Sequence, residues 1–354
     1  MYPNPPSVGT TRAIVVPKEN AESLLRNLRM ERLVDRTMKT VKRGAAILIP
    51  VTAEPHFDLG PFRARLEAHV DLPHRVRPRD PRHEIRERLK AAGIPLAHAP
   101  RRWERIGNIL VLRLPSEGQS QARTIAKIFG TVLGARTVVQ DRSGIHGPMR
   151  VPDVQVLWGN GTETVHLEGG VRYAMDIARV MFSSGNLAER VGIADRVRPG
   201  AVVVDLFAGI GYFSLPIAVR GRAATVYGCE LNPVSFHYLV ENVRLNRATN
   251  LVPLLGDCRA VAPRGIADWV IMGHFDARDY LDVGFDALRG NGTIVYHELC
   301  PKEQYPDAMT QRLAAAARAH WMNVHAIQTR IVKSYAPGIV HSAAQVEVTR
   351  QNRA

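Results

Sequence analysis

Three acidic residues follow short apolar runs in the second half of the chain, and they carry the clearest chemical signal. Asp205 ends the run AVVVD, Glu230 ends YGCE, and Asp257 follows LVPLLG. Apolar runs that alternate with helical segments predict strands of a parallel sheet, and the carboxyl ends of such strands meet at one edge. We therefore expect the three carboxylates to lie near one another and to bind one ligand.

A turn with two glycines follows the first acid. Gly209 and Gly211, in DLFAGIGYF, let the backbone bend sharply and bring a ligand against bare amide groups at the start of a helix. A dinucleotide-binding fingerprint requires a third glycine, and Ser214 stands at that position. Asp205 also disfavours a pyrophosphate, whereas it suits S-adenosylmethionine, which carries an ammonium and a sulfonium. A tight turn without a ligand is the alternative for this motif by itself.

The second and third acids make the nucleoside interpretation more specific. Glu230 lies 25 residues beyond Asp205, at a strand end where an acid accepts hydrogen bonds from both ribose hydroxyls. Its alternative role, capping the next helix, is already filled by Asn232 ahead of Pro233. Asp257 can bind the exocyclic amine of adenine. Three acids in this order predict a class I S-adenosylmethionine-dependent transferase.

The elements that must position these acids alternate between strand and helix from about residue 154 onward. Apolar β-branched strands between helices predict a parallel sheet covered on both faces, and two consecutive final strands predict an antiparallel hairpin at one edge. The predicted fold class is therefore α/β, a Rossmann-like class I methyltransferase fold with a seven-stranded mixed sheet, preceded by smaller N-terminal α+β domains. The predicted strands span 201–205, 224–229, 251–255, 269–272, 292–297, 325–333 and 344–349, and the predicted helices begin at 212 or span 233–245, 280–288 and 306–320.

The 354 residues are too many for one ordinary domain, and the sequence changes character several times. Residues 1–11 contain Pro and Gly and predict a loose tail, whereas 54–80 lack clear periodicity and predict a linker. Two apolar runs around a helical pattern predict a small α+β domain over 12–53. A second, basic α+β domain is expected over 81–153, and the cofactor-binding domain over 154–354.

The positive charge of the chain is concentrated in its first half. Residues 1–150 carry 27 Lys and Arg against 14 Asp and Glu, an excess of 13 in a chain whose net charge is +14. Most of these cations are Arg, whose guanidinium binds phosphate oxygens in pairs. Such asymmetry is typical of a surface that binds a nucleic-acid backbone, and a solvated surface with a basic bias is the alternative.

Several function classes lack support in the sequence. No apolar run approaches the roughly 20 residues that span a bilayer, and the N-terminus lacks the basic-then-apolar pattern of a signal peptide. We therefore expect a cytoplasmic protein with no membrane partner. The three cysteines form no C-x-x-C pair and the histidines before residue 100 lack metal spacing, so no metal is expected. We also expect a monomer.

Longer stretches of the chain resemble one family of enzymes. MFSSGNLAER (181–190) and KSYAPGIVH (333–341) flank the cofactor motifs, and segments 101–114 and 129–159 precede them. Together with DLFAGIGYFSLPIAV, these stretches resemble the archaeal and eukaryotic tRNA-modifying family that acts on guanosine beside the anticodon. Residues 12–53 resemble its small N-terminal domain. One branch comprises tRNA (guanine-N1) methyltransferases, and the other moves the 3-amino-3-carboxypropyl arm of S-adenosylmethionine onto the tricyclic base 4-demethylwyosine.

Departures from the methyltransferase pattern favour the second branch. The methyltransferases carry Asn-Leu/Pro-Pro after the fourth strand, where this chain has VIMGHF (270–275), and Ser-Pro-Arg where this chain has Ser184, Gly185 and Asn186. The resemblance thus implies aminocarboxypropyl transfer to 4-demethylwyosine at position 37 of tRNA(Phe), in wybutosine biosynthesis. The nearest alternative is methylation of guanine 37 at N1. A catalytically silent tRNA-binding protein and a Rossmann oxidoreductase are more distant alternatives.

The resemblance also implies roles for single residues that bind the cofactor. Ser183 and Arg190 hold the methionine arm, with the Arg190 guanidinium on its carboxylate. Glu230 holds the ribose. Asp257 and the backbone amide of Cys258 hold the adenine.

Three further residues are candidates for the reaction itself. Glu189 matches the glutamate that serves as base in the methyltransferase branch, and His274 is a second candidate for removing the proton from the ring carbon. An ion pair on a helix face is the alternative for Glu189. Arg150 matches the family's substrate-side arginine, with a loop salt bridge as its alternative. The resemblance implies that residues 12–150 grip the tRNA while the anticodon-loop base is flipped into the C-terminal pocket.

Overall fold

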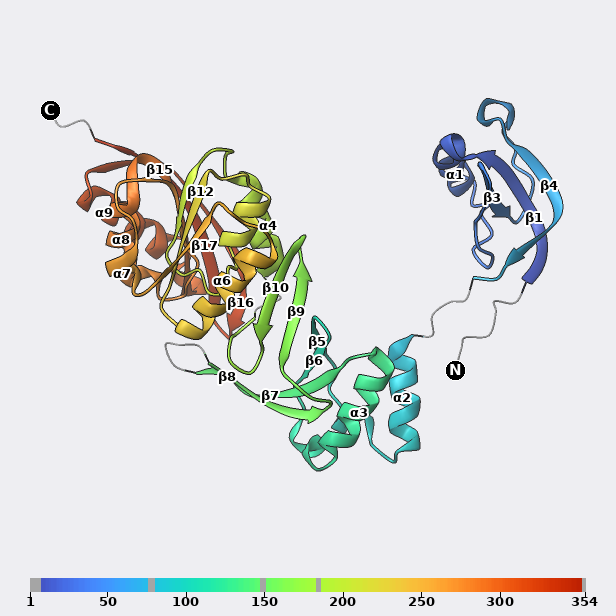
Figure 1. Ribbon diagram of the computed structural model, residues 1–354, viewed down its shortest axis with the longest axis horizontal. Coiled ribbons are helices and arrows are strands. Elements are labelled where there is room, and N and C mark those ends of the chain that lie inside the picture. The colour runs from blue at the N-terminus through green and yellow to red at the C-terminus, as the bar shows by residue number, and fades with distance from the viewer. Residues whose placement is uncertain (1–7, 76–79, 147–150, 183–185, 352–354) are drawn as a thin grey trace. The chain divides into compact units, whose positions relative to one another are not determined.

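The computed structural model describes residues 8–75, 80–146, 151–182 and 186–351 (Figure 1). The chain divides into two units, Met1–Glu84 and Ile85–Ala354. We call them the N-terminal unit and the C-terminal unit. Each has its own hydrophobic core, and the predicted catalytic and cofactor-binding residues all belong to the C-terminal unit.

The N-terminal unit is a four-stranded antiparallel sheet with one helix. The strand order is β2-β3-β1-β4, so the first strand lies in the interior of the sheet. Successive residues of β1 face opposite sides, and Ala13 and Val15 pack in one core cluster while Ile14 and Val16 pack in another. The elements are β1 (Val8–Pro17), α1 (Ala21–Met30), β2 (Val41–Arg43), β3 (Ala46–Val51) and β4 (Arg65–Pro73).

The predicted linker over 54–80 is wrong for its central part, because that part forms β4. The strand pairs with β1 along most of its length, from Val8 opposite Pro73 to Val15 opposite Arg65. Its apolar residues recur at every second position, and the buried ones are Val70 and Leu72. Charged residues between them obscure this alternation in the sequence. The predicted tail over 1–11 likewise ends earlier, since β1 begins at Val8.

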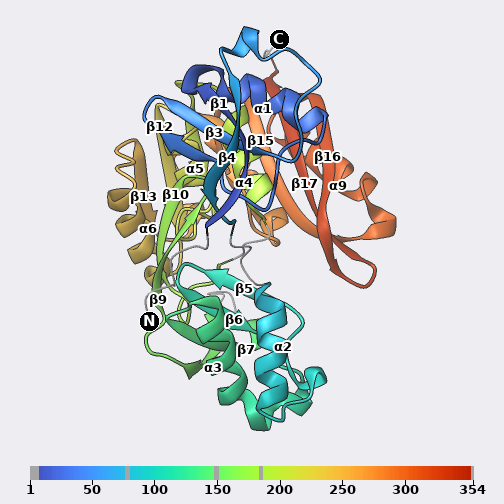
Figure 2. The ribbon, with the colours of Figure 1, turned by 90° about the vertical axis from the view of Figure 1, so that its right-hand side faces the viewer.

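The C-terminal unit begins with a four-stranded sheet in the order β5-β6-β7-β8, in which only β6 and β7 run parallel. Figure 2 shows its two helices, which pack Ile85, Leu89, Ile125 and Phe129 against strand residues such as Leu110. The elements are α2 (Pro81–Ala91), β5 (Trp103–Ile106), β6 (Ile109–Leu112), α3 (Ala122–Leu133), β7 (Thr137–His146) and β8 (Val151–Trp158).

A two-stranded hairpin follows, formed by β9 (Glu163–Glu168) and β10 (Val171–Asp176). The sequence analysis did not predict it. The hairpin lies beside α6 (Figure 1), and the buried side chain of Asn242 joins them. Its amide accepts a hydrogen bond from the Ala174 N–H at 2.6 Å and donates to the Ala174 carbonyl at 3.2 Å and to the Ile210 carbonyl at 3.0 Å.

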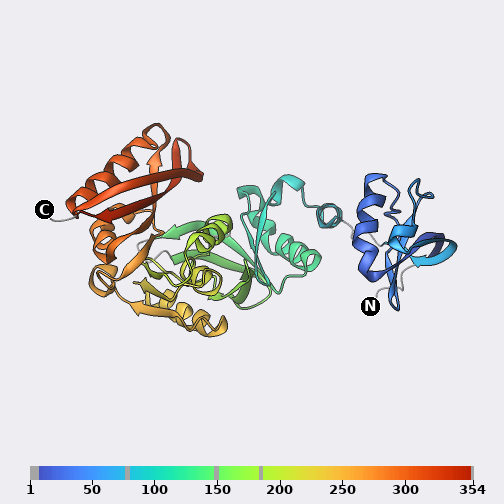
Figure 3. The same cartoon turned by 90° about the horizontal axis from the view of Figure 1, so that it is seen from above.

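The predicted seven-stranded mixed sheet is confirmed. Its order is β13-β12-β11-β14-β15-β17-β16, with the first five strands parallel and β17 inserted antiparallel between β15 and β16. The predicted C-terminal hairpin therefore forms one edge, with α9 packed along it (Figure 3). The strands are β11 (Val202–Asp205), β12 (Thr225–Glu230), β13 (Leu251–Leu255), β14 (Ala267–Met272), β15 (Leu288–Pro301), β16 (Met322–Ala336) and β17 (Ile339–Arg350).

Helices cover both faces of this sheet. Val203 packs in one core cluster and its neighbour Val204 in the other, which is the signature of strands buried on both sides. In the part of the chain that the structure describes, no helix is long and apolar enough to cross a membrane. The helices are α4 (Leu187–Arg196), α5 (Ser214–Val219), α6 (Pro233–Leu245), α7 (Cys258–Val261), α8 (Leu281–Ala287) and α9 (Asp307–Ala319).

Candidate functional site

Asp205 lies fully buried beneath the glycine turn. Its two carboxylate oxygens accept hydrogen bonds from the Phe207 N–H at 3.2 Å and from the Ser214 hydroxyl at 2.6 Å. Burial raises the pKa of Asp205 to about 6, against the lowering effect of these hydrogen bonds. The carboxylate thus fastens the end of β11 to the first residue of α5 and shapes the turn from below.

The two glycines of the turn meet a steric requirement. Gly209 and Gly211 have φ values of +59° and +102°, which side-chain-bearing residues rarely adopt. A Cβ on Gly209 would lie 2.4 Å from the Tyr212 ring, and one on Gly211 would lie 2.5 Å from Leu215. The turn therefore keeps its bare backbone because no larger residue fits there.

Glu230 connects the turn to the next strand. One carboxylate oxygen accepts the Gly209 N–H at 2.8 Å and the other accepts the Asn232 N–H at 2.7 Å. Burial raises the pKa of Glu230 despite these bonds. Asn232 itself accepts from the Val234 N–H at 2.9 Å, so it caps α6 as predicted. Each oxygen of Glu230 keeps lone-pair capacity for a further donor.

Asp257 stands at the same edge of the sheet. The Gly256 N–H donates to the Glu230 carbonyl at 2.9 Å, which holds the two strand ends together. Asp257 caps α7 through the Arg259 N–H at 2.9 Å, and it forms an ion pair with the Arg259 side chain. Hydrogen bonds from Arg259 lower the pKa of Asp257. Cys258 is buried beside it. The structure thus brings together the turn, Glu230 and Asp257 as the sequence predicted.

The side chain of Arg190 is buried and contacts other side chains of the protein. Its guanidinium forms an ion pair with Glu168 of β9 and lies 5.0 Å from the ring centroids of both Phe182 and Tyr212. Its predicted role on the methionine arm stays a prediction, and in this structure Arg190 joins α4 to the β9–β10 hairpin. The predicted residues Ser183 and Arg150 lie outside the described residues.

Glu189 belongs to a cluster that the sequence analysis did not foresee. Both of its oxygens accept hydrogen bonds from Arg330 of β16, with Nε at 2.9 Å from Oε2. The Nε2 atom of His297, on β15, lies 3.6 Å from Glu189 Oε1. The Nδ1 atom of His297 in turn lies 2.9 Å from Nε2 of His341, on β17.

One signal in the sequence could have identified His297. It follows the apolar run TIVY just as the three acids follow theirs, and a polar residue at such a strand end belongs at the ligand edge. In the sheet, Tyr296 pairs with Met272 at the end of β14, so His297 stands one residue beyond that end. Arg330 gives no comparable signal, because its strand bears polar residues throughout.

His274, the second candidate for removing a proton, follows β14 directly. Its Nδ1 accepts the Asp276 N–H at 3.2 Å, and its ring lies 5.2 Å from the Phe207 ring. Its side chain is about one quarter exposed, at 26%. The His274 ring thus lies beside Phe207, which follows Asp205 by two residues. Its role in proton transfer stays a prediction.

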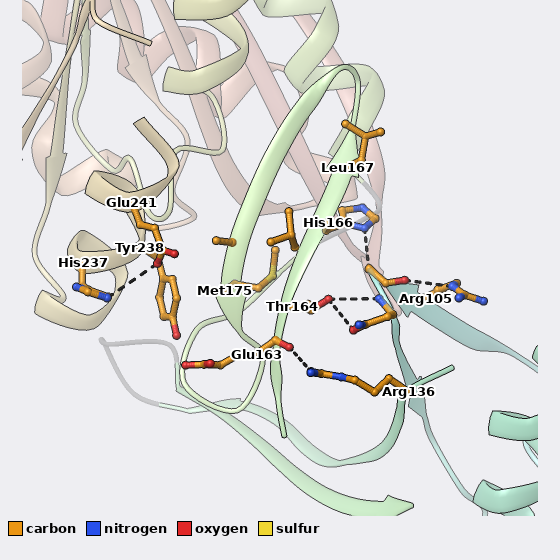
Figure 4. A pocket seen from close by; sticks show the side chains of 14 residues that line it. Arg105, Arg136, Glu163, Thr164, His166, Leu167, Met175, His237, Tyr238 and Glu241 are labelled. Carbon is orange, nitrogen blue, oxygen red and sulfur yellow. Dashed lines mark hydrogen bonds and ion pairs between the residues drawn. The ribbon is translucent and has the colours of Figure 1, made fainter. Parts of the chain in front are cut away.

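A separate concavity of about 850 Å³ lies on the N-terminal side of the C-terminal unit (Figure 4). Arg105, Arg136 and the outer face of the β9–β10 hairpin form one side, and His237, Tyr238 and Glu241 of α6 form another. Among the predicted catalytic and cofactor-binding residues that the structure describes, none lines it. The guanidinium groups of Arg105 and Arg136 donate to backbone carbonyls. This concavity is therefore distinct from the edge that carries the glycine turn.

Comparison with protein families gives two matches within the C-terminal unit. Residues 164–325 match the TRM5/TYW2 methyltransferase domain, and residues 85–162 match the TYW2 N-terminal domain. The boundary between these matches falls between β8 and β9.

Individual relatives come from both kinds of enzyme. The chain is 35% identical over 251 residues to the tRNA(Phe) (4-demethylwyosine(37)-C(7)) aminocarboxypropyltransferase of Pyrococcus horikoshii, covering 70% of this chain and 90% of that protein. It is 30% identical over 330 residues to the tRNA (guanine(37)-N(1))-methyltransferase Trm5b of Pyrococcus abyssi, covering 92% of this chain and 96% of that protein.

Solved structures of both kinds of enzyme are similar to the structure of this chain. The crystal structure of P. horikoshii TYW2 in complex with MeSAdo superimposes with a TM-score of 0.68 at 33% identity, covering 75% of this chain and 98% of that one. The structure of Trm5b from Pyrococcus abyssi superimposes with a TM-score of 0.66 at 29% identity, covering 96% of this chain and 99% of that one. The fold of both is thus the fold described above.

Proposed function

Because the chain belongs to the TRM5/TYW2 family of S-adenosylmethionine-dependent transferases, we propose that it transfers the 3-amino-3-carboxypropyl group to 4-demethylwyosine at position 37 of tRNA(Phe). The observation that carries the choice of group is the end of β14, where Met272, Gly273 and His274 replace the Asn and Pro of the methyltransferase pattern. A Cβ on Gly273 would lie 2.5 Å from the Phe213 ring, so an Asn or Pro there would displace that ring.

The residues at the sheet edge fit S-adenosylmethionine. The glycine turn offers a bare backbone, Glu230 retains acceptor capacity for two ribose hydroxyls, and Asp257 is about one third exposed, at 32%, beside the buried Cys258. Asp205 has no exposed surface, so we assign it to the shape of the turn and not to direct contact with the ammonium group. When bound, S-adenosylmethionine supplies an electrophilic carbon attached to its sulfonium.

The protein's own contribution is mainly to position the reactants. In-line displacement requires the acceptor carbon and the attacked carbon to be aligned, and a small misplacement costs orders of magnitude in rate. As the ring carbon bonds to the attacked carbon, the C–S bond would break and its electron pair would leave with the sulfur as a neutral thioether. The ring carbon then loses a proton, and the C–H electron pair restores aromaticity. Glu189 accepts this proton in our proposal, with His274 as the second candidate. Arg190 and Glu168 stabilise the start of α4, which carries Glu189.

Isotope labelling of S-adenosylmethionine at two alternative carbons tests the proposal. Purified protein is incubated with tRNA(Phe) that bears 4-demethylwyosine and with S-adenosylmethionine labelled either in the carboxyl carbon or in the methyl carbon. We expect carboxyl label in the tRNA and no methyl label. Transfer of methyl label alone would refute the proposal. Unmodified tRNA with guanosine at position 37 serves as the matched control substrate and should accept neither label.

The N-terminal unit favours a second candidate, methylation of guanine 37 at N1. The Trm5b relative aligns with 92% of this chain, whereas the aminocarboxypropyltransferase relative aligns with 70%. The longer alignment therefore extends over residues that the shorter one omits. The control substrate distinguishes the two candidates, because an N1-methyltransferase would place methyl label on unmodified tRNA.

A further inference from the structure

Two buried histidines lie face to face at the carboxyl edge of the sheet. His297 and His341 are each 2% exposed, and their facing ring nitrogens lie 2.9 Å apart. Aromatic rings seal the pair, with Phe213 centred 5.5 Å from His297 and Phe275 centred 4.9 Å from His341. Phe213 follows the glycine turn and Phe275 follows β14, so the pair lies among the loops of the proposed site.

Both imidazoles are neutral at pH 7. The pKa of His297 and of His341 is lowered to about 3, mainly by burial, and the neighbouring Arg330 contributes to the lowering in both, as His297 does for His341. The other charged groups that face the pair are Glu189 from α4 and Lys333 from β16, and Glu189 acts in the opposite direction on His341. Each ring therefore carries one proton, and its location is set by its neighbours.

Two arrangements of these protons keep the hydrogen bond between the rings, and they differ in which group of His297 faces the Glu189 carboxylate. If His297 donated through Nδ1 to His341, the lone pair on His297 Nε2 would face the Glu189 carboxylate and His341 Nδ1–H would be left over. In the described residues, neither His297 Nε2 nor His341 Nδ1 has a hydrogen-bond partner. This arrangement therefore sets a lone pair against a carboxylate and also leaves a buried N–H without an acceptor, and both are unfavourable.

The reverse arrangement places an N–H of His297, and not a lone pair, toward the Glu189 carboxylate. His341 Nε2–H donates to His297 Nδ1, so the proton of His297 stands on Nε2, 3.6 Å from Glu189 Oε1. This separation is longer than a hydrogen bond, and such contacts at active sites shorten when substrate binds. The His297 N–H then makes no hydrogen bond in this structure but faces a carboxylate, and a lone pair is left on His341 Nδ1.

We infer that His341 and His297 form a donor chain of fixed tautomer that positions the Glu189 carboxylate to accept the proton from the acceptor base. The inference rests on the proposed function in taking Glu189 as the proton acceptor. Arg330 holds both Glu189 oxygens from β16, and His297 reaches Oε1 from β15. Two elements thereby fix the direction in which the carboxylate points. Neither histidine is itself a catalytic residue, because each acts through Glu189.

Two substitutions of His297 separate the contact to Glu189 from the contact to His341. Gln places an amide N–H near the position of Nε2, whereas Asn replaces only Nδ1. We expect His297→Asn to lower kcat by about 10- to 100-fold with the KM for S-adenosylmethionine changed less than about threefold, and His297→Gln to recover most of that loss. His320→Gln, at the far end of α9 and bonded to Asp282, is the matched control and should leave kcat unchanged.

The measurements distinguish a positioning role from loss of folding. Thermal stabilisation by S-adenosylmethionine reports whether each variant still binds the cofactor. Equal loss of kcat in the Asn and Gln variants, or full activity in both, would overturn the inference. The assay is scored on whichever group the wild-type protein transfers, so a wild type that transfers methyl contradicts the proposed function without deciding this point.

A spectroscopic measurement tests the tautomers without any substrate. In the full-length protein with ¹⁵N-labelled histidine, we expect His297 and His341 both to carry their proton on Nε2 at pH 7. Resonances assigned through the single variants would show this directly. A proton on Nδ1 of His297 contradicts the inference whatever the enzyme transfers.

Discussion

At the scale of single residues, similar side chains differ in what their surroundings allow. Asp205, Glu230 and Asp257 are all acids at strand ends, but Asp205 is buried under the turn, Glu230 shares its oxygens with two backbone amides, and Asp257 is partly exposed beside Arg259. Only the last two retain capacity for a ligand. Burial thus separates the structural role of Asp205 from the binding roles proposed for Glu230 and Asp257.

The buried histidine pair makes stability depend on pH. Because the pKa of each ring is about 3 in the folded protein and near 6.5 in the unfolded chain, the pair contributes full stability above pH 6.5 and loses it as the pH falls toward 3. Asp205 acts oppositely, since its raised pKa of about 6 favours the folded state below that pH. The loss for each histidine is up to about 1 kcal/mol per pH unit.

Denaturant unfolding at several pH values measures this dependence. We expect the free energy of unfolding of a His297→Gln/His341→Gln double variant to fall less steeply between pH 6.5 and 3 than that of the wild type. His320→Gln is the control and should parallel the wild type. Parallel curves for the double variant and the wild type would show that the two rings are not buried as described.

At the scale of elements, the glycine turn is held in place by its neighbours as well as by its own sequence. Asn242 of α6 bonds to Ala174 of β10 and to Ile210 within the turn, and Glu230 of β12 accepts the Gly209 N–H. The β9–β10 hairpin is thus joined to the glycine turn of the proposed cofactor site, although none of its residues was expected there. A defect in the hairpin should reach the turn through Asn242.

Replacing Asn242 with Leu tests this connection. The substitution keeps the volume but leaves one N–H and two carbonyls buried without partners, so we expect a loss of about 2–4 kcal/mol in unfolding free energy and weaker binding of S-adenosylmethionine. Asn246→Leu is the matched control. Asn246 bonds to Arg172 of the same hairpin but is partly exposed, so water can replace its bonds. Unaltered cofactor affinity in Asn242→Leu, measured by calorimetry, would contradict the connection.

At the scale of the whole molecule, the excess positive charge does not follow the division into two hydrophobic cores. The hydrophobic clusters of the N-terminal unit contain residues from 13 to 72 only, so that unit and the C-terminal unit do not share a core. Residues 1–75 carry 12 basic and 8 acidic residues, whereas 76–150 carry 15 and 6. Most of the positive excess therefore belongs to the segment that joins the cofactor-binding domain.

Deletion of residues 1–75 tests how the two parts share the proposed tRNA. Because the deletion removes a whole sheet and only four net charges, we expect tRNA affinity to weaken and its dependence on salt to become shallower, while affinity for S-adenosylmethionine is unchanged. Binding titrations at several salt concentrations measure both effects. Equal loss of tRNA and cofactor affinity would contradict this division of labour. A full-length variant with Arg36 and Lys39 changed to Gln is the control for lost charge without lost structure.

The sequence by itself determined the central sheet, the glycine turn and the acids beside it. These depend on residues close together in the chain: an apolar run fixes a strand, and the residue that ends it must lie at the ligand edge. Asn232 as the cap of α6 was predictable for the same reason. The strand β4 was missed because charged side chains on its outer face hide an alternation that only pairing with β1 reveals.

Only the tertiary structure decided which side chains meet across distant strands. Glu189 and Arg330 are 141 residues apart in the chain, and His297 and His341 are 44 apart, so no local pattern could pair them. The contact between the two histidines follows from the antiparallel pairing of β15 with β17 and its register, and the contact between Glu189 and Arg330 joins helix α4 to strand β16. Likewise, Arg190 could be assigned to a ligand from its position in the sequence, but folding places the buried Glu168 against it. Long-range packing chooses the partners of charged groups, because a charge taken out of water must be paired wherever the fold supplies an opposite one.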